Sequence, residues 1–325
     1  MSEPIMQVVD LKKTYPVPAR HLGERARELR AVDGVSFSIP KGGIFGVVGE
    51  SGCGKSSLGR CLLRMEEITG GSLLFQGEDI TKLSGNALLE LRRHMQMIFQ
   101  NPYGSFNPKQ KIGSALHEVA KVHKIPRGAA QEKITHLLSE INLPQDTLNR
   151  IPSEMSGGQL QRLAIARALL LTPDFIVADE PVSALDVSVQ AQILNLLMDL
   201  REKFSLTMLF ISHEMTVVRH LCDEVAVMYL GTVVEQAETE ELFRNLLHPY
   251  TQALMSAIPN IDPDRKMERV ILQGDLPSAI DVPLGCPFAP RCIYCTEQCR
   301  AEKPILREVA PGHHVACHLI GEAGA

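Results

Sequence analysis

Short apolar runs alternate with helical patterns along much of the chain. The run Ile44–Val48 leads into a glycine-rich turn and then into a helical pattern that begins near Lys55. Two further apolar runs, at residues 175–178 and 207–211, flank a helical pattern at about 188–203. Buried parallel strands are typically continuous apolar runs, and strands alternating with helices form such sheets. The pattern predicts an α/β fold with a mostly parallel sheet covered on both faces.

Other segments depart from this alternation. Residues 6–11 and 32–39 are predicted to be strands separated by a polar, arginine-rich loop at about 18–30. Residues 107–170 are mostly helical in pattern, which indicates a subdomain inserted between the two halves of the sheet.

Beyond Ser256 the composition changes. Prolines there exclude long helices, among them Pro259, Pro263, Pro277, Pro283, Pro287 and Pro290. A small appendage with few apolar residues usually needs a covalent or metal staple. We therefore predict two domains, residues 1–258, with the helical subdomain at about 105–170, and residues 259–325.

Composition narrows the class of protein. The 325 residues are 45% hydrophobic and 22% charged, with a net charge of −5, which argues against a nucleic-acid partner. No apolar stretch approaches the length of a spanning helix, and Met1-Ser2-Glu3-Pro4 does not begin a signal peptide. We expect a cytoplasmic protein that reaches any membrane through protein partners.

A phosphate-binding loop follows the first buried strand. The segment from Gly49 to Ser56 matches G-x-x-x-x-G-K-[ST], in which backbone N–H groups and a helix N-terminus bind phosphate. Lys55 would contact the β- and γ-phosphates, and the Ser56 hydroxyl would bind Mg²⁺. The expected nucleotide-binding residues here are Gly49, Ser51, Gly52, Cys53, Gly54, Lys55, Ser56 and Ser57.

Two acids end the apolar run at 175–178. Asp179 and Glu180 would lie at the carboxyl edge of the sheet, where ligands bind. We expect Asp179 to hold Mg²⁺ and Glu180 to orient or deprotonate the attacking water.

The segment Met155-Ser156-Gly157-Gly158-Gln159, followed by an alanine-rich helical pattern, resembles the signature sequence of ATP-binding cassette (ABC) ATPases. The family usually has Leu where this chain has Met155. A helix cap would explain the Ser-Gly-Gly turn alone but not the whole string. The resemblance implies that Ser156, Gly157, Gly158 and Gln159 bind ATP held by a partner subunit.

Other motifs of this family follow in order. Tyr15 matches the aromatic residue that stacks on adenine, and Gln100 matches the glutamine that senses Mg²⁺ and water. Residues 183–186 resemble the loop that crosses the dimer interface, and His213 matches the switch histidine at the γ-phosphate. Glu180, His213 and Gln100 are therefore the expected catalytic residues, and Ser56, Gln100 and Asp179 the expected Mg²⁺ ligands.

The resemblance implies a P-loop (RecA-like) nucleotide-binding domain with antiparallel β and helical subdomains. It also implies a small, cysteine-rich C-terminal extension, and hydrolysis between two cassettes that face each other.

Several strings are similar to those of oligopeptide and dipeptide importer ATPases. They are residues 100–108, 248–251, 274–278 and 285–288, with Arg291-Cys292. This implies two transmembrane permease subunits, a second ATPase subunit, an extracytoplasmic substrate-binding protein, and a peripheral position on the cytoplasmic face of the plasma membrane. A nickel or glutathione importer and a non-transport ABC ATPase remain the alternatives.

Five of the eight cysteines lie near the C-terminus. Cys286, Cys292, Cys299 and Cys317 are separated by five, six and seventeen residues. Four thiolates can ligate Zn²⁺ or an iron–sulfur cluster, and Cys292 with Cys295 leaves a second pairing open. The resemblance implies a [4Fe–4S] cluster on the first four, with Cys295 spare; unligated thiols are the alternative.

Overall fold

The computed structural model describes residues 3–19, 27–257 and 277–321. They fall into two compact units, each built from several chain segments. The helical unit is drawn from Met1–Glu3, Pro40–Gly43 and Lys82–Ile211. The P-loop unit is drawn from Pro4–Ile39, Ile44–Thr81 and Ser212–Ala325. The predicted domain boundary at residues 258 and 259 lies outside the described residues, as does the string 274–276.

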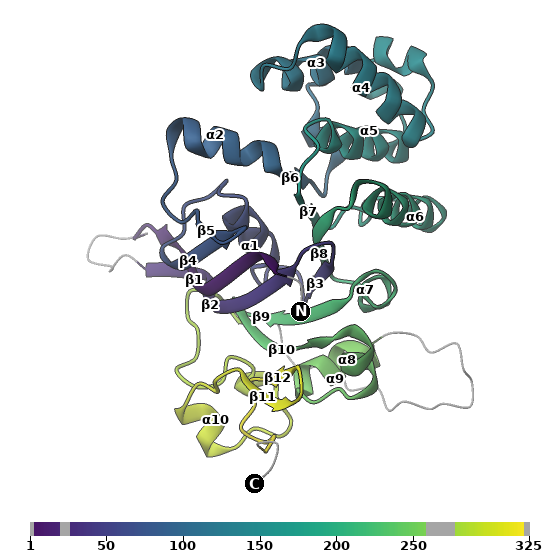
Figure 1. Cartoon of the computed structure of the whole chain (residues 1–325). Coiled ribbons are helices and arrows are strands. Elements are labelled where there is room, and N and C mark those ends of the chain that lie inside the picture. Colours follow the sequence, from purple (N-terminus) through teal and green to yellow (C-terminus); the bar gives the residue numbers. More distant parts are fainter. Residues whose placement is uncertain (1–2, 20–26, 258–276, 322–325) are drawn as a thin grey trace. The chain divides into compact units, whose positions relative to one another are not determined.

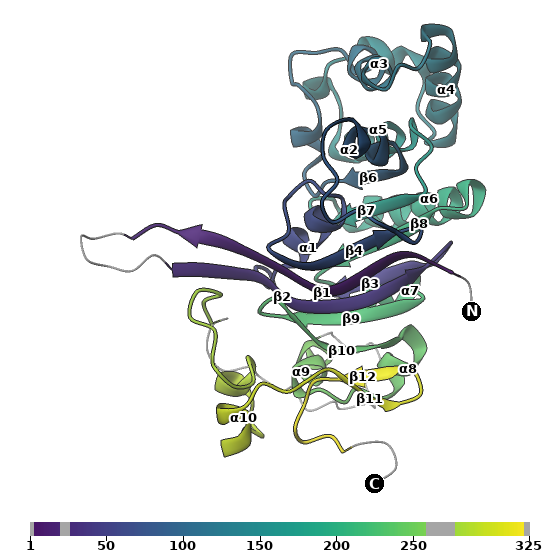
Figure 2. The same ribbon diagram turned by 60° about the vertical axis from the view of Figure 1, so that its left-hand side comes forward.

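The P-loop unit contains an antiparallel four-stranded sheet with the order β2-β1-β4-β5. Its strands are β1 (Pro4–Val17), β2 (Arg27–Pro40), β4 (Gly70–Phe75) and β5 (Glu78–Asp79). The long β1 and β2 run side by side in Figure 2. Both predicted strands before the phosphate loop are confirmed, and each is longer than its apolar core indicated.

A second group of strands in this unit follows the order β11-β12-β10-β9-β3. They are β3 (Ile44–Val48), β9 (Glu224–Tyr229), β10 (Thr232–Glu238), β11 (Arg307–Ala310) and β12 (His313–Val315). The pairing of β3 with β9 is parallel, whereas β10 pairs antiparallel with both β9 and β12. Every residue of β3 is buried, as its apolar sequence predicts.

The helices of the P-loop unit are short. They are α1 (Lys55–Leu62), α7 (Met215–Leu221), α8 (Thr239–Arg244), α9 (Pro249–Ser256), α10 (Glu297–Ala301) and the 3₁₀ turn η4 (Ala289–Arg291). The five-residue α10 agrees with the prediction that prolines exclude long helices near the C-terminus.

The C-terminal residues are attached to the sheet rather than packed around a large core of their own. In Figure 1, β12 and β11 lie next to β10 in the same layer. The buried side chains of Val309, Val315 and Cys317 form a small cluster, against which Leu247 and Ile320 pack. These few apolar side chains are sufficient to hold the C-terminal residues in place, because the sheet supplies the rest of the packing surface.

The helical unit carries parallel strands in the order β8-β7-β6. Its strands are β6 (Met95–Ile98), β7 (Phe175–Asp179) and β8 (Thr207–Ser212). Its helices are α2 (Gly85–His94), α3 (Ile112–Val122), α4 (Arg127–Glu140), α5 (Gly157–Leu169) and α6 (Val187–Phe204), with 3₁₀ turns η1 (Pro102–Ser105), η2 (Gln145–Asn149) and η3 (Pro152–Glu154).

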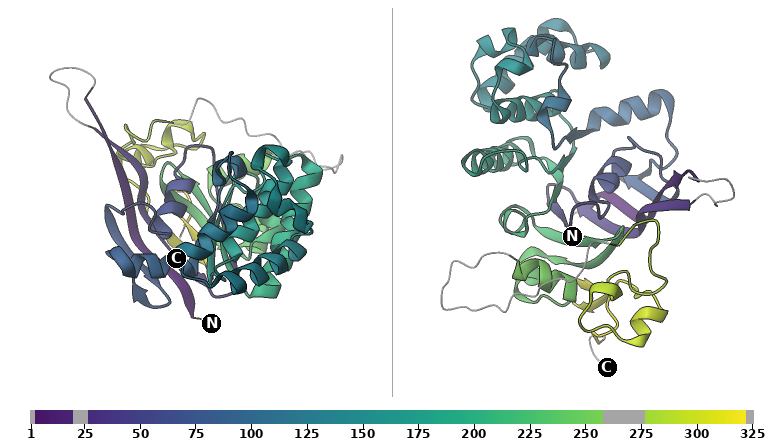
Figure 3. Two further views of the ribbon diagram at one scale, coloured as in Figure 1. Left: turned by 90° about the horizontal axis from the view of Figure 1, so that it is seen from above. Right: turned by 180° about the vertical axis from the view of Figure 1, so that it is seen from behind.

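The predicted helical stretch at 107–170 is confirmed as α3, α4 and α5, which gather together in both views of Figure 3. The predicted helix at 188–203 is α6. None of the helices in the described parts of the chain combines the length and apolarity needed to cross a membrane.

Candidate functional site

The phosphate loop joins β3 to α1, as predicted. Gly54 is the N-cap of α1 and has a φ of 107°, a left-handed conformation that favours glycine. A Cβ atom added to Gly54 would lie 2.0 Å from the carbonyl oxygen of Ala31, so no other residue fits there without moving the backbone. The loop is therefore packed from behind by the chain around Ala31. Ser51 and Gly52 are exposed on the loop, while Cys53 is buried beneath it.

Lys55 is positioned by the loop it belongs to. Its Nζ donates to the carbonyl oxygens of Gly49 at 2.7 Å and Glu50 at 2.9 Å. The side chain is 4% exposed, so its charge lies within the protein rather than in solvent. Ser56 and Ser57 follow it in the first turn of α1, both half-buried. A helix N-terminus with a buried lysine is suited to bind phosphate.

Tyr15 lies against the same helix. Its hydroxyl donates to the carboxylate of Glu66 and lies 3.4 Å from Ser57 Oγ. Burial raises the pKa of the Tyr15 hydroxyl, and the bond to Glu66 raises it further. The Lys13 ammonium lies 4.6 Å from the ring centroid. The structure thus brings Tyr15 to the phosphate loop, and a base stacking on this ring would use the face that Lys13 does not cover.

His213 lies at the end of β8, where the sequence predicted it. Its imidazole is about half exposed, and its Nε2 lies 3.8 Å from the carboxylate of Glu214. Ser212 next to it accepts a hydrogen bond from the Glu214 N–H at 2.9 Å. The turn after β8 is thereby held in one shape.

In the helical unit, Gln100 and Glu180 are brought together from positions 80 residues apart. The Gln100 side-chain amide donates to Glu180 Oε2 at 2.9 Å. Ser183 supports this pair, because its hydroxyl donates to the Glu180 carbonyl oxygen at 3.1 Å and lies 3.4 Å from the Gln100 amide. Two of the three predicted catalytic residues are thus in direct contact.

Glu180 has an unusual backbone conformation. Its φ is 45°, which costs a residue with a Cβ about 1–2 kcal/mol. The Glu180 N–H donates to the carbonyl oxygen of Ile211 at 3.0 Å, which holds this geometry. Asp179, one residue before, ends β7 and is 4% exposed. Strained residues are enriched at functional sites, and Glu180 is one of nine described non-glycine residues with a positive φ.

The predicted signature residues begin α5. Ser156 is the N-cap: its Oγ accepts from the Gln159 N–H at 3.3 Å, and Gln159 Oε1 accepts from the Ser156 N–H at 3.0 Å. This capping box is the helix-cap arrangement that the sequence alone also allowed. Ser156 remains exposed, so its hydroxyl faces solvent at the helix N-terminus.

The two signature glycines allow close packing. A Cβ atom on Gly158 would lie 2.5 Å from Val189 Cγ1 in α6, and one on Gly157 would lie 3.3 Å from Leu185 Cδ2. The start of α5 is therefore packed against Val189 in α6 and against Leu185 of the predicted dimer-interface loop, residues 183–186.

The loop after Gln100 is tied to α5. The Arg167 guanidinium donates to the carbonyl oxygen of Ser105 and lies 5.7 Å from the Phe106 ring centroid. Before this anchor, Phe99 and Tyr103 are 36% and 51% exposed. The loop thus has a fixed base and an exposed aromatic tip.

The four predicted cluster cysteines are neighbours in the P-loop unit. Cys286, Cys299 and Cys317 are buried and Cys292 is half-buried, and none of them is in a disulfide. The Cys286 N–H donates to the Cys299 carbonyl oxygen at 2.7 Å. Burial raises the pKa of the Cys286 thiol to about 11, and the nearby thiols of Cys299 and Cys317 add to this.

These thiols do not form a metal-ligand arrangement. Among the described residues, which include all eight cysteines, no three His, Cys, Asp or Glu side chains converge closely enough to hold a metal ion. Thiolates are the usual ligands of iron–sulfur clusters. The positions of these sulfur atoms, however, do not suit such a cluster.

Two contacts to the phosphate loop were missed from the sequence. The Glu50 N–H donates to the Tyr250 hydroxyl at 2.8 Å, and the Arg291 side chain forms an ion pair with Glu50. Arg291 stands 241 positions after Glu50, and nothing in the spacing of either residue pairs them. The only signal was that Tyr250 and Arg291 both belong to strings similar to those of the oligopeptide and dipeptide importer ATPases.

Two family models match parts of the chain. A family model described as "ABC transporter" matches residues 32–183. A second, described as "Oligopeptide/dipeptide transporter, C-terminal region", matches residues 234–299, which begins within β10.

Relatives match over nearly the full length. The chain is 46% identical over 323 residues to the dipeptide transport ATP-binding protein DppF of Escherichia coli (strain K12), covering 99% of this chain and 96% of that protein. It is 47% identical over 322 residues to the oligopeptide transport ATP-binding protein AppF of Bacillus subtilis (strain 168), covering 98% of each.

Solved structures show the same fold. The cbiO1 protein from Clostridium perfringens, part of the ABC transporter complex cbiONQ, gives a TM-score of 0.65 at 23% identity over 75% of this chain and 92% of that chain. The dimeric structure of MJ0796, a bacterial ABC transporter cassette, gives 0.62 at 25% identity over 72% of this chain and 98% of that chain. The phosphate loop, the Gln100–Glu180 pair and these matches together show that the chain belongs to the ATP-binding subunits of the ABC transporters, in the oligopeptide and dipeptide transport family.

Proposed function

We propose that this chain binds and hydrolyses ATP to power an importer of dipeptides or oligopeptides. The observation that carries the proposal is the near full-length similarity to the dipeptide and oligopeptide transport ATP-binding proteins. That similarity extends through the C-terminal region, which a general ABC cassette does not require. The cassette is proposed to occupy residues 1–258 and the extension residues 259–325.

In the proposed reaction, the phosphate loop and Lys55 bind the triphosphate, and Tyr15 stacks on the adenine. Ser56, Asp179 and Gln100 would hold Mg²⁺, which neutralises charge on the phosphates when bound. Glu180 accepts a proton from water as the water oxygen bonds to the γ-phosphorus. The bond from that phosphorus to the β–γ bridging oxygen then breaks, and ADP and phosphate leave.

The Gln100–Glu180 hydrogen bond supports this division of roles. An amide that donates to a carboxylate oxygen fixes the orientation of the carboxylate, which a general base needs. His213, at the end of β8, is proposed to contact the γ-phosphate.

The signature residues are proposed to act on a partner's nucleotide. One chain would supply Lys55 and Glu180, and the second ATPase subunit would supply its own counterparts of Ser156 and Gly158. The exposed Ser156 hydroxyl at the N-terminus of the 13-residue α5 supports this, because such an end favours an anion. The related cassette MJ0796 has been solved as a dimer.

The remaining partners are proposed to be two permease subunits and an extracytoplasmic substrate-binding protein. The chain would then lie on the cytoplasmic face of the plasma membrane without crossing it. The exposed Phe99 and Tyr103 support contact with a permease, because aromatic side chains are enriched at interfaces.

Steady-state hydrolysis tests the proposed activity. Purified chain should release phosphate from ATP, and Lys55→Ala should abolish this by weakening nucleotide binding. Phosphate release at the wild-type rate by Lys55→Ala would contradict the assigned site, and no release even with the permease subunits present would contradict the function.

We further propose a [4Fe–4S] cluster on Cys286, Cys292, Cys299 and Cys317, with Zn²⁺ as the alternative metal. The donor type supports it, because residues 286–317 carry these four cysteines and thiolates are the ligands of such clusters. Binding would require their sulfur atoms to move into a ligand arrangement, which would tighten this small segment.

Measuring the iron and zinc content of the purified chain tests the proposed cluster. Protein purified without oxygen should contain about four irons per chain and lose them in Cys299→Ser. One zinc per chain, or no metal in either protein, would overturn the cluster. Cys295→Ser is the matched control and should keep the iron.

A further inference from the structure

Arg291, in the C-terminal extension, forms an ion pair with Glu50 of the phosphate loop. Arg291 Nη1 lies 2.7 Å from Glu50 Oε2, and Nη2 lies 3.1 Å from Glu50 Oε1. The two side chains are 7% and 26% exposed, so solvent screens the pair only weakly. Two parallel bonds between a guanidinium and a carboxylate fix both groups in position as well as balancing their charges.

Glu50 is also held through its backbone. Its N–H donates to the Tyr250 hydroxyl at 2.8 Å, and its carbonyl oxygen accepts from Lys55 Nζ at 2.9 Å. The same residue therefore joins α9, the extension and the buried lysine of the loop.

Arg291 itself has a rigid base. Phe288, at the start of the same turn, packs edge-on against Tyr229 with ring centroids 5.2 Å apart. Tyr229 in turn packs against Tyr250 at 4.7 Å. The Arg291 guanidinium lies 6.0 Å from the Tyr229 ring centroid. These aromatic contacts keep the guanidinium aimed at Glu50.

The position of Glu50 is electrostatically unusual. It is the first residue after Gly49 in a loop whose task is to bind a triphosphate, so a bare carboxylate there would repel the ligand. The repulsion is cancelled only while an opposite charge stays beside it.

We propose that Arg291 is a positioning residue for nucleotide binding, which neutralises Glu50 and so makes the phosphate loop able to accept ATP. The inference rests on the proposed function, since it requires that this loop binds ATP. It gives the extension a direct role in the nucleotide site of its own chain.

Nucleotide affinity of the full-length chain tests the proposal. Arg291→Met should raise the Kd for MgATP about ten-fold, which corresponds to about 1.4 kcal/mol. Adding Glu50→Gln to it should restore the Kd to within about three-fold of wild type, because the repelling charge is gone. If Arg291 had a purely structural role, removing the Glu50 charge would not restore the affinity for MgATP.

Two single variants keep the test decisive if Arg291→Met does not fold. Glu50→Gln alone should leave the Kd unchanged or lower, because Arg291 then adds an uncompensated positive charge. Arg291→Lys should stay within about three-fold of wild type. A ten-fold loss of affinity in Glu50→Gln, or an unchanged Kd in a folded Arg291→Met protein, overturns the proposal.

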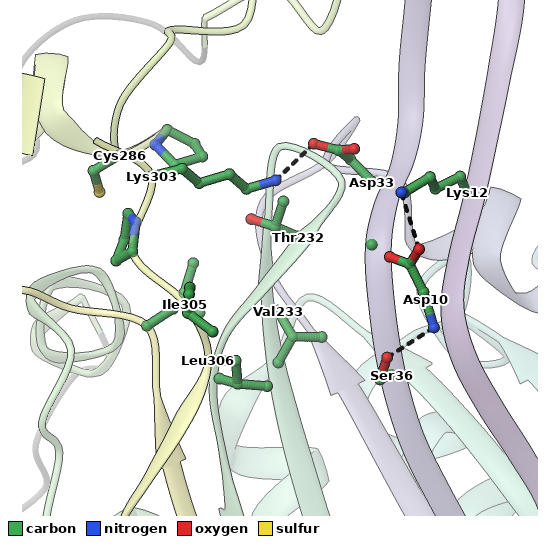
Figure 4. Close-up of a pocket in the computed structure, with 15 residues that line it drawn as sticks. Asp10, Lys12, Asp33, Ser36, Thr232, Val233, Cys286, Lys303, Ile305 and Leu306 are labelled. Carbon is green, nitrogen blue, oxygen red and sulfur yellow. Dashed lines mark hydrogen bonds and ion pairs between the residues drawn. The ribbon is translucent and has the colours of Figure 1, made fainter. Parts of the chain in front are cut away.

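Lys303→Met is the matched control. Lys303 Nζ lies 2.7 Å from Asp33 Oδ2, so this pair also ties the extension to the sheet but without contacting the phosphate loop. Figure 4 shows the pair at the wall of a cavity. The volume of this cavity is about 520 Å³. Lys303→Met should leave the Kd for MgATP as in wild type. A loss of affinity equal to that of Arg291→Met would mean that loosening the extension anywhere weakens ATP binding, and that Arg291 has no special role. A wild-type chain that binds no ATP would instead contradict the proposed function itself.

Discussion

At the scale of single residues, the chemistry depends on where one carboxylate points. Glu180 is held in a left-handed conformation directly after β7, and Gln100 donates to one of its two oxygens. We therefore propose Glu180, rather than the buried Asp179, as the group that accepts the proton from water.

Glu180→Gln should reduce ATP hydrolysis by about 10²–10⁴-fold, the usual contribution of a general base. Glutamine keeps the size and the contact with Gln100 but cannot accept the proton, so the affinity for ATP should remain. The variant should elute as a dimer with ATP on size-exclusion chromatography, whereas wild type returns to monomer as ATP is consumed. Wild-type turnover would exclude the assigned role.

Gly158→Ala should destabilise the protein by about 1–3 kcal/mol, because its Cβ would lie 2.5 Å from Val189 Cγ1. Valine is stiff about its first side-chain torsion and cannot turn away at low cost. The matched control is Gly128→Ala, at the same second position of α4, where nothing lies within 4 Å of the added atom. That change should be neutral or stabilise by up to about 1 kcal/mol. Equal melting temperatures for the two variants would show that the α5–α6 approach is not tight.

At the scale of elements, α9 connects the nucleotide loop to the end of the sheet. His248 caps this helix, because its Nδ1 accepts from the Tyr250 N–H at 3.0 Å. Burial lowers the pKa of His248 to about 4, although Glu235, itself bonded to His313, acts in the opposite direction. An accepting Nδ1 agrees with a neutral imidazole.

This cap predicts a pH dependence of stability. The pKa of His248 is about 4 in the fold and 6.5 when unperturbed, so the unfolded chain binds more protons between these values. The free energy of unfolding should therefore fall as pH drops from 6.5 to 4, by about 2 kcal/mol between pH 7 and pH 5.

His248→Asn tests this directly, since asparagine also caps helices but does not titrate. Denaturant unfolding at pH 7 and pH 5 should show a smaller difference in the variant, by about 2 kcal/mol. The same difference in both proteins would mean that other groups, chiefly carboxylates, account for the acid sensitivity.

The sequence predicted those elements whose hydrophobic pattern or turn residues lie within the element itself. Strand β3, the turn at Gly54 and helix α1 follow from neighbouring residues, as does the run ending at Glu180. The Arg291–Glu50 pair and the attachment of β12 to β10 join residues far apart in the chain, so no periodicity indicates them. The capping box at Ser156 was foreseen only as an alternative, because one serine can serve both a helix and a ligand.

At the scale of the whole molecule, the chain combines the motifs of an ABC cassette with the C-terminal region of peptide transporters. The cassette motifs concern ATP, whereas the C-terminal region matches transporters of peptides. Because Arg291 connects that region to the phosphate loop, the extension is expected to influence nucleotide binding.

The most direct test of peptide import is uptake by the assembled complex. The chain, its partner ATPase and the permease subunits would be placed in lipid vesicles, with the substrate-binding protein and a labelled dipeptide or oligopeptide on the side opposite the ATPases. We predict peptide accumulation that requires ATP and is lost in both Lys55→Ala and Glu180→Gln. A complex that hydrolyses ATP but moves no peptide, or that moves peptide equally well with Lys55→Ala, would contradict the account.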